Sequence, residues 1–185
     1  MMFLSTLWLP IVLSAVIIFV ASSIMHMLLP YHRSDYDKIP DEDNVRSAMR
    51  AAGLKRGLYV FPFCTHKEMN SPEVIEKYNQ GPNGMMIVFP TGRPFMPKYL
   101  GLWFGYCLVI AFFVAYIAGH TVAQGTDYLA VFRVVGATAF MAFGLGPLAN
   151  VVWKGYPWSF VLKEAVDGLI YGLLMAGTFG WLWPR

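Results

Sequence analysis

Charged side chains are scarce in this sequence: they make up 14% of its 185 residues, against about 25% in a typical soluble domain. With 57% hydrophobic residues and a mean hydropathy of +0.50, this scarcity is typical of membrane proteins. The net charge of +3 includes no block of basic residues, so no nucleic-acid-binding surface is indicated. We therefore expect membrane lipids, and no nucleic acid, among the partners.

Cysteine is scarce, and the common catalytic motifs are absent from the sequence. The two cysteines are Cys64, in a polar segment, and Cys107, inside an apolar run, so no disulfide framework is implied. The sequence contains no nucleotide-binding glycine loop, no serine nucleophile motif and no paired-carboxylate signature. These absences point away from the common enzyme classes, and we expect no cofactor.

Long apolar runs are what the chain has in abundance. A helix needs about 20 apolar residues to cross a bilayer. The first run is too long for the apolar part of a signal peptide and lacks a positively charged start, so we expect it to remain as a membrane helix. The predicted fold is an all-α four-transmembrane-helix bundle, with a three-helix region at 99–185. The expected spans are 4–29, 99–120, 128–152 and 160–183.

Residues 31–97 are polar instead, and hold nine of the 14 basic and eight of the 11 acidic residues. Acidic residues at 41–43 and Gly53 bound one predicted helix, and Ser71-Pro72 starts another that runs to Gln80. Short strands are predicted at 58–63 and 85–89. Two short strands are not stable alone in water. We therefore predict a small extramembrane α+β lobe that needs the helices, the membrane or another chain.

Small residues recur at helical spacing in the apolar runs. Residues four apart share a helix face, and small residues on such a face let two helices approach closely in lipid. The pattern predicts tight helix packing or a homo-oligomer. The residues concerned are Gly101, Gly105, Gly168, Gly172, Ala176 and Gly180.

The distribution of basic residues predicts the orientation. Four spans would place both termini on one side of the membrane and residues 31–97 on the other, together with the 153–159 connection. Cytoplasmic loops carry an excess of lysine and arginine. We therefore expect a cytoplasmic lobe and both termini outside. The basic residues near the helix ends on the lobe side are Arg33, Lys38, Arg93, Lys98, Lys154 and Lys163.

The second half of the chain supports a comparison with a known family. The comparison rests on three stretches: a glycine- and alanine-rich third helix, the connection 150–158 (NVVWKGYPW), and a last helix with an acidic start and small residues. In these stretches, mainly within residues 99–185, the chain resembles a bacterial family of small four-helix integral membrane proteins of unknown function. The resemblance implies a four-helix fold in the bacterial inner (cytoplasmic) membrane, and it implies no activity.

Glu164 and Asp167 are the first candidates for chemistry. Charged residues inside membrane helices are costly and are often functional. The two carboxyls are three residues apart, and such a pair could bind a cation or pass a proton. The alternative is that they complement the positive end of the helix dipole.

A metal site is the second possibility. Imidazole and thiolate groups bind transition metals, and Cys64 and His66 are close in sequence. Zinc sites usually show two such pairs, so His32, Cys64 and His66 are weak candidates, with His26 and Asp35 as further possible ligands. The polar segment 31–37 could also bind lipid headgroups or a partner, or be a solvated helix exit.

Three hypotheses about function follow. The first is a structural or accessory membrane component that packs or oligomerises through its small-residue faces, or joins a larger complex. The second is a small transporter or channel component that uses Glu164 and Asp167. The third is a membrane-bound metal-binding protein or enzyme built on the loop residues.

Overall fold

The computed structural model describes residues 2–185 and divides them into two compact units. The first, which we call the bundle, contains the residues up to Asp35 together with Phe95–Arg185. The second, the lobe, is Tyr36–Pro94. The chain is mostly helical, at 68%, and has a small two-stranded sheet, as predicted.

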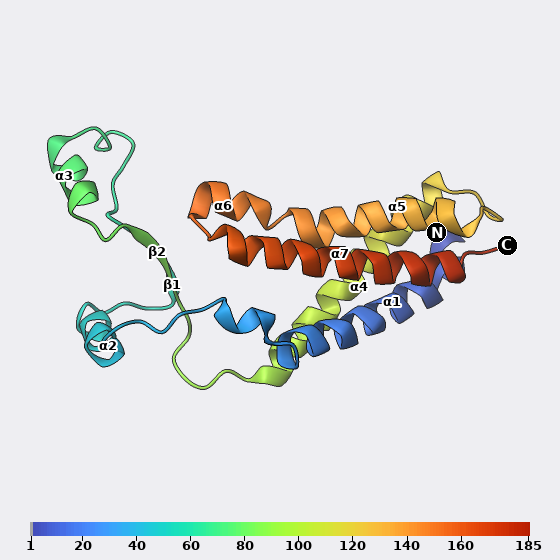
Figure 1. The fold of residues 1–185 in the computed structure, drawn as a ribbon, viewed down its shortest axis with the longest axis horizontal. Coiled ribbons are helices and arrows are strands. Elements are labelled where there is room, and N and C mark those ends of the chain that lie inside the picture. Colours follow the sequence, from blue (N-terminus) through green and yellow to red (C-terminus); the bar gives the residue numbers. More distant parts are fainter. Residues whose placement is uncertain (1) are drawn as a thin grey trace. The chain divides into compact units, whose positions relative to one another are not determined.

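The helices of the bundle follow the predicted apolar runs closely. Among them α5 and α6 follow one another along α7, and α1 begins near the end of α7 (Figure 1). The most extensive packing is between α5 and α7, followed by α1 with α4 and α1 with α7. The elements are α1 (Met2–Met27), a short 3₁₀ helix η1 (Pro30–Ser34), α4 (Met96–Thr121), α5 (Tyr128–Phe140), a π-helical turn η2 (Met141–Leu145), α6 (Leu148–Lys154) and α7 (Trp158–Trp181).

Three helical stretches are long and apolar enough to cross a membrane: Leu4–Met27, Met96–Thr121 and Tyr128–Lys154. Their length and apolar composition fit a membrane protein, as predicted. The 24 residues of α7 are long enough for a further span. However, Lys163, Glu164 and Asp167 near its start make it more polar than the other three helices.

The interface between α5 and α7 is made of small residues. A Cβ atom added to Gly168 would lie 2.4 Å from Gly144 Cα, and one added to Gly172 would lie 3.2 Å from Phe140 N. A Cβ added to Gly136 would lie 3.2 Å from Ala176 Cβ. The small residues of α7 at 168, 172 and 176 are therefore covered by α5 and η2 of the same chain.

Gly101 and Gly105 of α4 are different. A Cβ atom added at either position would meet no atom within 4 Å among the described residues. The expectation that these glycines pack closely is therefore not met inside this chain.

The third apolar run is not the single helix expected over 128–152. It changes from α5 to the π-helical turn η2, and a turn at 146–147 follows before α6 begins. Pro147 has no N–H to continue a helical ladder. A Cβ added to Gly144, within η2, would lie 3.2 Å from the Ala165 carbonyl oxygen. The interruption thus lies where this helix passes close to α7.

The lobe contains two helices and the sheet, at nearly the predicted positions. Its elements are α2 (Glu42–Ala51), β1 (Gly57–Phe61), α3 (Pro72–Gln80) and β2 (Gly84–Val88). Ser71 caps α3 by accepting a hydrogen bond from Val74 N. The strands pair antiparallel.

One face of the sheet carries exposed aliphatic side chains. Leu58 pairs with Ile87 and Val60 with Met85 in the ladder, and all four are exposed. Within the described part of the lobe, Val74 is the one buried hydrophobic residue. A sheet of two strands with so little buried apolar area is marginal in stability.

Candidate functional site

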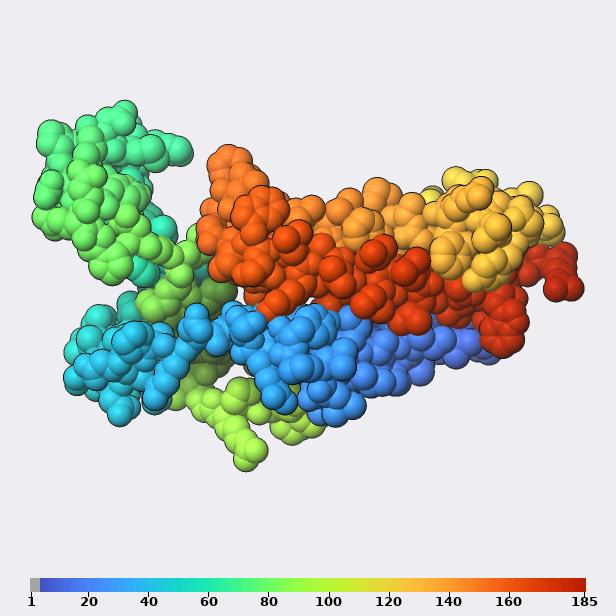
Figure 2. All heavy atoms as spheres, in the orientation of Figure 1, coloured from blue at the N-terminus to red at the C-terminus, as the bar shows by residue number. Residues whose placement is uncertain are grey.

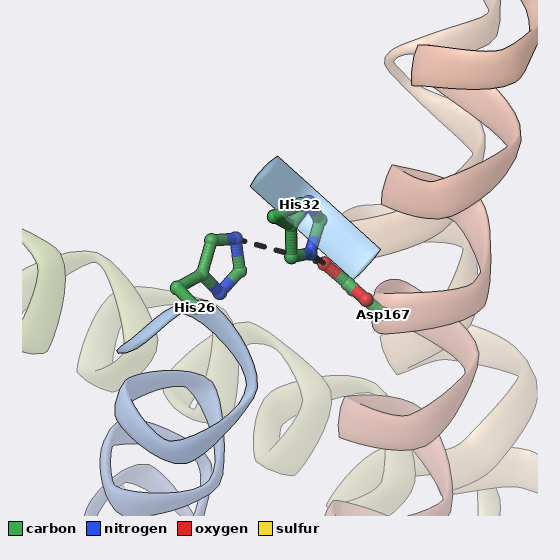
Figure 3. Close-up of side chains that lie close together, drawn as sticks. All are labelled: His26, His32 and Asp167. Atoms are coloured by element: carbon green, nitrogen blue, oxygen red, sulfur yellow. Dashed lines mark hydrogen bonds and ion pairs between the residues drawn. The ribbon is translucent and has the colours of Figure 1, made fainter. Parts of the chain in front are cut away.

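A cluster of polar side chains lies where α1, η1 and the start of α7 meet. Figure 3 shows its centre: His26 from the last turn of α1, His32 from η1 and Asp167 from α7. In Figure 2 the blue residues that follow α1 lie against the orange-red start of α7. The cluster belongs entirely to the bundle, whereas the sequence analysis had assigned residues 31–35 to the lobe.

Asp167 is the buried centre of this cluster, with a side chain only 5% exposed. Its Oδ1 accepts a hydrogen bond from the Tyr31 hydroxyl. Its Oδ2 lies 2.9 Å from His32 Nε2 and 3.7 Å from His26 Nε2. A carboxyl group in an apolar helix is thus surrounded by the groups that a buried charge requires.

A second carboxylate, Asp35, holds His32 from the other side. Asp35 Oδ2 is 2.5 Å from His32 Nδ1, and Asp35 Oδ1 accepts a hydrogen bond of 2.6 Å from Lys163 Nζ. Lys163 also donates to Ser34 Oγ, at 2.9 Å. Burial alone would raise the pKa of the Asp35 carboxyl, but the hydrogen bonds from Lys163 and His32 outweigh it and lower that pKa.

The geometry of η1 explains why these residues can converge. Pro30 is the first residue of η1, and its fixed φ suits a helix start. A 3₁₀ helix has three residues per turn, so residues three apart lie one above the other. His32 and Asp35 have this spacing, and their side chains meet beside α7.

Tyr31 supplies the remaining hydrogen bond to Asp167. Burial, and next the hydrogen bond to Asp167, raise the pKa of the Tyr31 hydroxyl well above its usual range. Tyr31 therefore keeps its proton and acts as a donor to the carboxylate.

His26 is the most accessible member, with a side chain 52% exposed. Its Nδ1 lies 3.0 Å from the carbonyl oxygen of Ser22 in the preceding turn. The Ser22 hydroxyl in turn accepts a hydrogen bond of 2.8 Å from Trp103 Nε1 of α4. The rings of His26 and His32 stack with centroids 4.2 Å apart and an interplanar angle of 12°.

A cleft of about 570 Å³ borders the cluster. Asp167, His26 and Glu164 contribute its polar lining, and the rest is mostly aromatic. Glu164 is half-buried and makes no hydrogen bond or ion pair within the described residues. Tyr171 also lines this cleft. Its buried hydroxyl has no hydrogen-bond partner among the residues that the structure describes. Within the described part of the chain, the cleft therefore has one carboxylate without a partner, Glu164, and a buried hydroxyl without a partner, Tyr171, in its lining.

The charges of this region do not balance if both histidines are neutral. With all three ionised, Asp35, Glu164 and Asp167 then carry three negative charges, and among the described residues Lys163 is the one ammonium group paired with any of them. The region would carry two net negative charges. A bound cation, or protonation of the histidines, would compensate them.

The residues predicted as metal candidates belong to different units. Cys64 and His66 lie in the lobe, where Cys64 Sγ is 3.8 Å from the Tyr78 hydroxyl. His32 lies in the bundle, where His26 and Asp167 are its neighbours. Lys163 forms its ion pair with Asp35.

Three residues of the site were missed or undervalued. Tyr31 was considered only as part of a polar surface segment. Tyr171 lies four residues after Asp167, so helical spacing could have placed it on the same face. Nothing local indicates that Trp103 would donate to Ser22 of α1.

Comparison with known proteins adds no identity: no family model, no curated protein and no solved structure matches this chain. The resemblance to a four-helix bacterial family therefore stays a prediction.

Proposed function

We propose that this chain is a four-span protein of the bacterial inner membrane, with α7 as the fourth span, the lobe in the cytoplasm and both termini outside. The length of α7 and its close packing on α5 support the fourth span. The basic residues near the helix ends on the lobe side support the orientation.

Its function, on this proposal, is that of an accessory membrane component that binds a cation beside Asp167. The observation that carries this proposal is the position of the Asp167 carboxylate, which is buried in a membrane helix yet borders an open cleft. A charge in such a place is costly and is usually retained for an ion or proton site. Glu164 supplies a second negative charge at the same cleft.

A purely structural role is the second candidate, and one observation favours it. Asp167, His32, Asp35 and Lys163 already satisfy one another in a network that fastens η1 to α7. On this view, the open glycine face of α4 would pack against a second copy or a partner helix.

The two candidates differ in what Asp167→Asn should do. The amide keeps the shape of the side chain: its oxygen can still accept from the Tyr31 hydroxyl, and its NH2 group can donate to His32 Nε2. It removes the charge. For a cation-binding component we expect a folded protein that fails to complement a deletion strain when expressed at the normal level. Asp37→Asn, at an exposed carboxylate next to the same segment, is the matched control and should complement fully.

Folding of both variants is checked by gel filtration and thermal unfolding in mild detergent. Full complementation by Asp167→Asn would remove the cation-binding role and leave the structural one.

A further inference from the structure

We propose that His26, His32 and Asp167 bind one divalent transition-metal ion, and this inference rests on the proposed cation-binding function. The three ligand atoms lie within 4.8 Å of one another, and they come from α1, η1 and α7. The site joins residues that are far apart in the sequence, and Figure 3 shows how they face one another.

The hydrogen bonds of both histidines select the nitrogen that a metal would use. His26 Nδ1 faces the Ser22 carbonyl oxygen, and a carbonyl can only accept, so this nitrogen carries the proton. His32 Nδ1 faces the Asp35 carboxylate and donates in the same way. In the neutral form of each ring, the lone pair is then on Nε2, the nitrogen that faces Asp167. A histidine that binds a metal through one ring nitrogen almost always donates the N–H of its other ring nitrogen to a carboxylate, a backbone carbonyl or water.

Asp35 and Lys163 complete this arrangement around His32. A carboxylate that accepts from a ligand histidine fixes its ring and raises its basicity. Lys163 holds that carboxylate in place, with Nζ 2.6 Å from Asp35 Oδ1. Asp35 is therefore a positioning residue, because it acts on the metal through His32.

The ligand distances are close to those of a tetrahedral site. Zinc bonds to nitrogen and oxygen of about 2.0–2.2 Å give ligand atoms about 3.3–3.6 Å apart at the tetrahedral angle. The observed distances from Asp167 Oδ2 are 2.9 Å to His32 Nε2 and 3.7 Å to His26 Nε2. His32 and Asp167 need to separate by a few tenths of an ångström.

The stacked rings require one further movement. A ring nitrogen directs its lone pair in the ring plane, so two parallel rings do not point at one ion. His26 must turn about its side-chain bonds to bind the metal. It can do so because it is half exposed at the end of α1, whereas His32 is held by Asp35.

The charge and chemistry of the site both favour a divalent transition metal. With neutral histidines, the three carboxylates and Lys163 leave two negative charges, which one divalent ion neutralises. Imidazole ligands select zinc and its neighbours over magnesium and calcium, which prefer oxygen. Three protein ligands also leave a fourth position for water. The cleft gives water access to this position.

The test is metal binding by the intact protein purified in mild detergent. After equilibrium dialysis against Zn²⁺, elemental mass spectrometry should find about one zinc per chain. Co²⁺ should give the visible absorption of a four-coordinate site. His32→Gln and Asp167→Asn should abolish this binding, and Asp35→Asn should weaken it by about 10–100-fold.

His26→Gln keeps the proposal falsifiable if changes at the buried residues prevent folding. This side chain is half exposed, so the variant should fold and still lose at least tenfold in affinity. His66→Gln in the lobe and His120→Gln at the end of α4 are controls that should bind as the wild type does. An unchanged affinity in His26→Gln, or no zinc in the wild type, would overturn the metal site.

Failure of this inference differs from failure of the proposed function. If the wild type binds no transition metal while Asp167→Asn still fails to complement, the site serves another cation and the metal inference is wrong. If Asp167→Asn complements fully, the proposed function is wrong whatever the zinc content.

Discussion

Gly168 and Gly144 lie so close that a methyl group added to Gly168 would come within 2.4 Å of the Gly144 Cα. No flexible side chain separates them, so the contact can be relieved only by moving α7 away from η2. We expect Gly168→Ala to lower the free energy of unfolding by about 1–3 kcal/mol, the usual cost of overpacking a core. Thermal unfolding in detergent measures this loss.

Gly101→Ala is the matched control, because a methyl group there meets no atom within 4 Å. Alanine favours a helix over glycine by up to about 1 kcal/mol, so this variant should be as stable as the wild type or slightly more. Equal melting temperatures for Gly168→Ala and the wild type would mean that η2 and α7 are not in close contact.

The hydrogen bond from Trp103 to Ser22 links α4 to α1 and can be measured directly. A double-mutant cycle with Trp103→Phe and Ser22→Ala isolates the interaction from the packing of the rings. Hydrogen bonds between membrane helices average about 0.6 kcal/mol in such cycles, and we expect a coupling of that size. Strictly additive effects of the two substitutions would contradict the bond.

Lys163→Gln should loosen η1 from α7. The substitution leaves the Asp35 carboxylate, 5% exposed, without its cation. Removing one partner of a fully buried pair costs about 3–5 kcal/mol; because Lys163 is 22% exposed, we expect about 2 kcal/mol. Amides of residues 31–35 should exchange faster with deuterium than in the wild type.

Lys77→Gln provides the comparison for that experiment. Lys77 pairs with Glu73 at 2.7 Å, but both side chains are largely exposed on α3. Such surface pairs contribute little to stability, because water and salt screen the charges, so Lys77→Gln should unfold almost as the wild type does. A loss as large as that of Lys163→Gln would indicate that the lobe depends on this pair.

Cysteine labelling tests the proposed orientation. Asp43→Cys in α2 and Gln124→Cys between α4 and α5 are introduced one at a time in a chain whose Cys64 and Cys107 are replaced by serine. Both positions are exposed. A membrane-impermeant thiol reagent on whole cells should label Gln124→Cys and leave Asp43→Cys unlabelled. The reverse pattern would place the lobe outside.

The sequence was sufficient for the features that depend on local pattern. Apolar runs predicted α1 and α4 to within a few residues, because burial in lipid requires a continuous apolar stretch. Ser71-Pro72 predicted the start of α3, because the serine cap and the proline geometry are both local. Asp167 was predicted as a candidate ion or proton site for a similar reason, because it is a charged residue inside an apolar helix.

The features that depend on tertiary contact were not predictable. The interruption at 146–147 arises where η2 meets α7, and proline alone does not show how a helix continues after it. His32 and Asp167 are 135 residues apart, and no periodicity or spacing links them. From the sequence, the acidic residues of α7 and the histidines near η1 were therefore predicted as two separate sites. In the structure they form one cluster.

That separation also determines when the cluster can form during synthesis. Tyr31, His32 and Asp35 emerge from the ribosome long before α7, which carries Lys163 and Asp167. Until α7 has been inserted, the end of α1 and all of η1 have none of these partners, and the chain between them must close a loop of well over a hundred residues. Contacts of such high sequence separation form late. The polar cluster is therefore a marker of completed assembly: a bundle in which His32 meets Asp167 has already brought its first and last helices together.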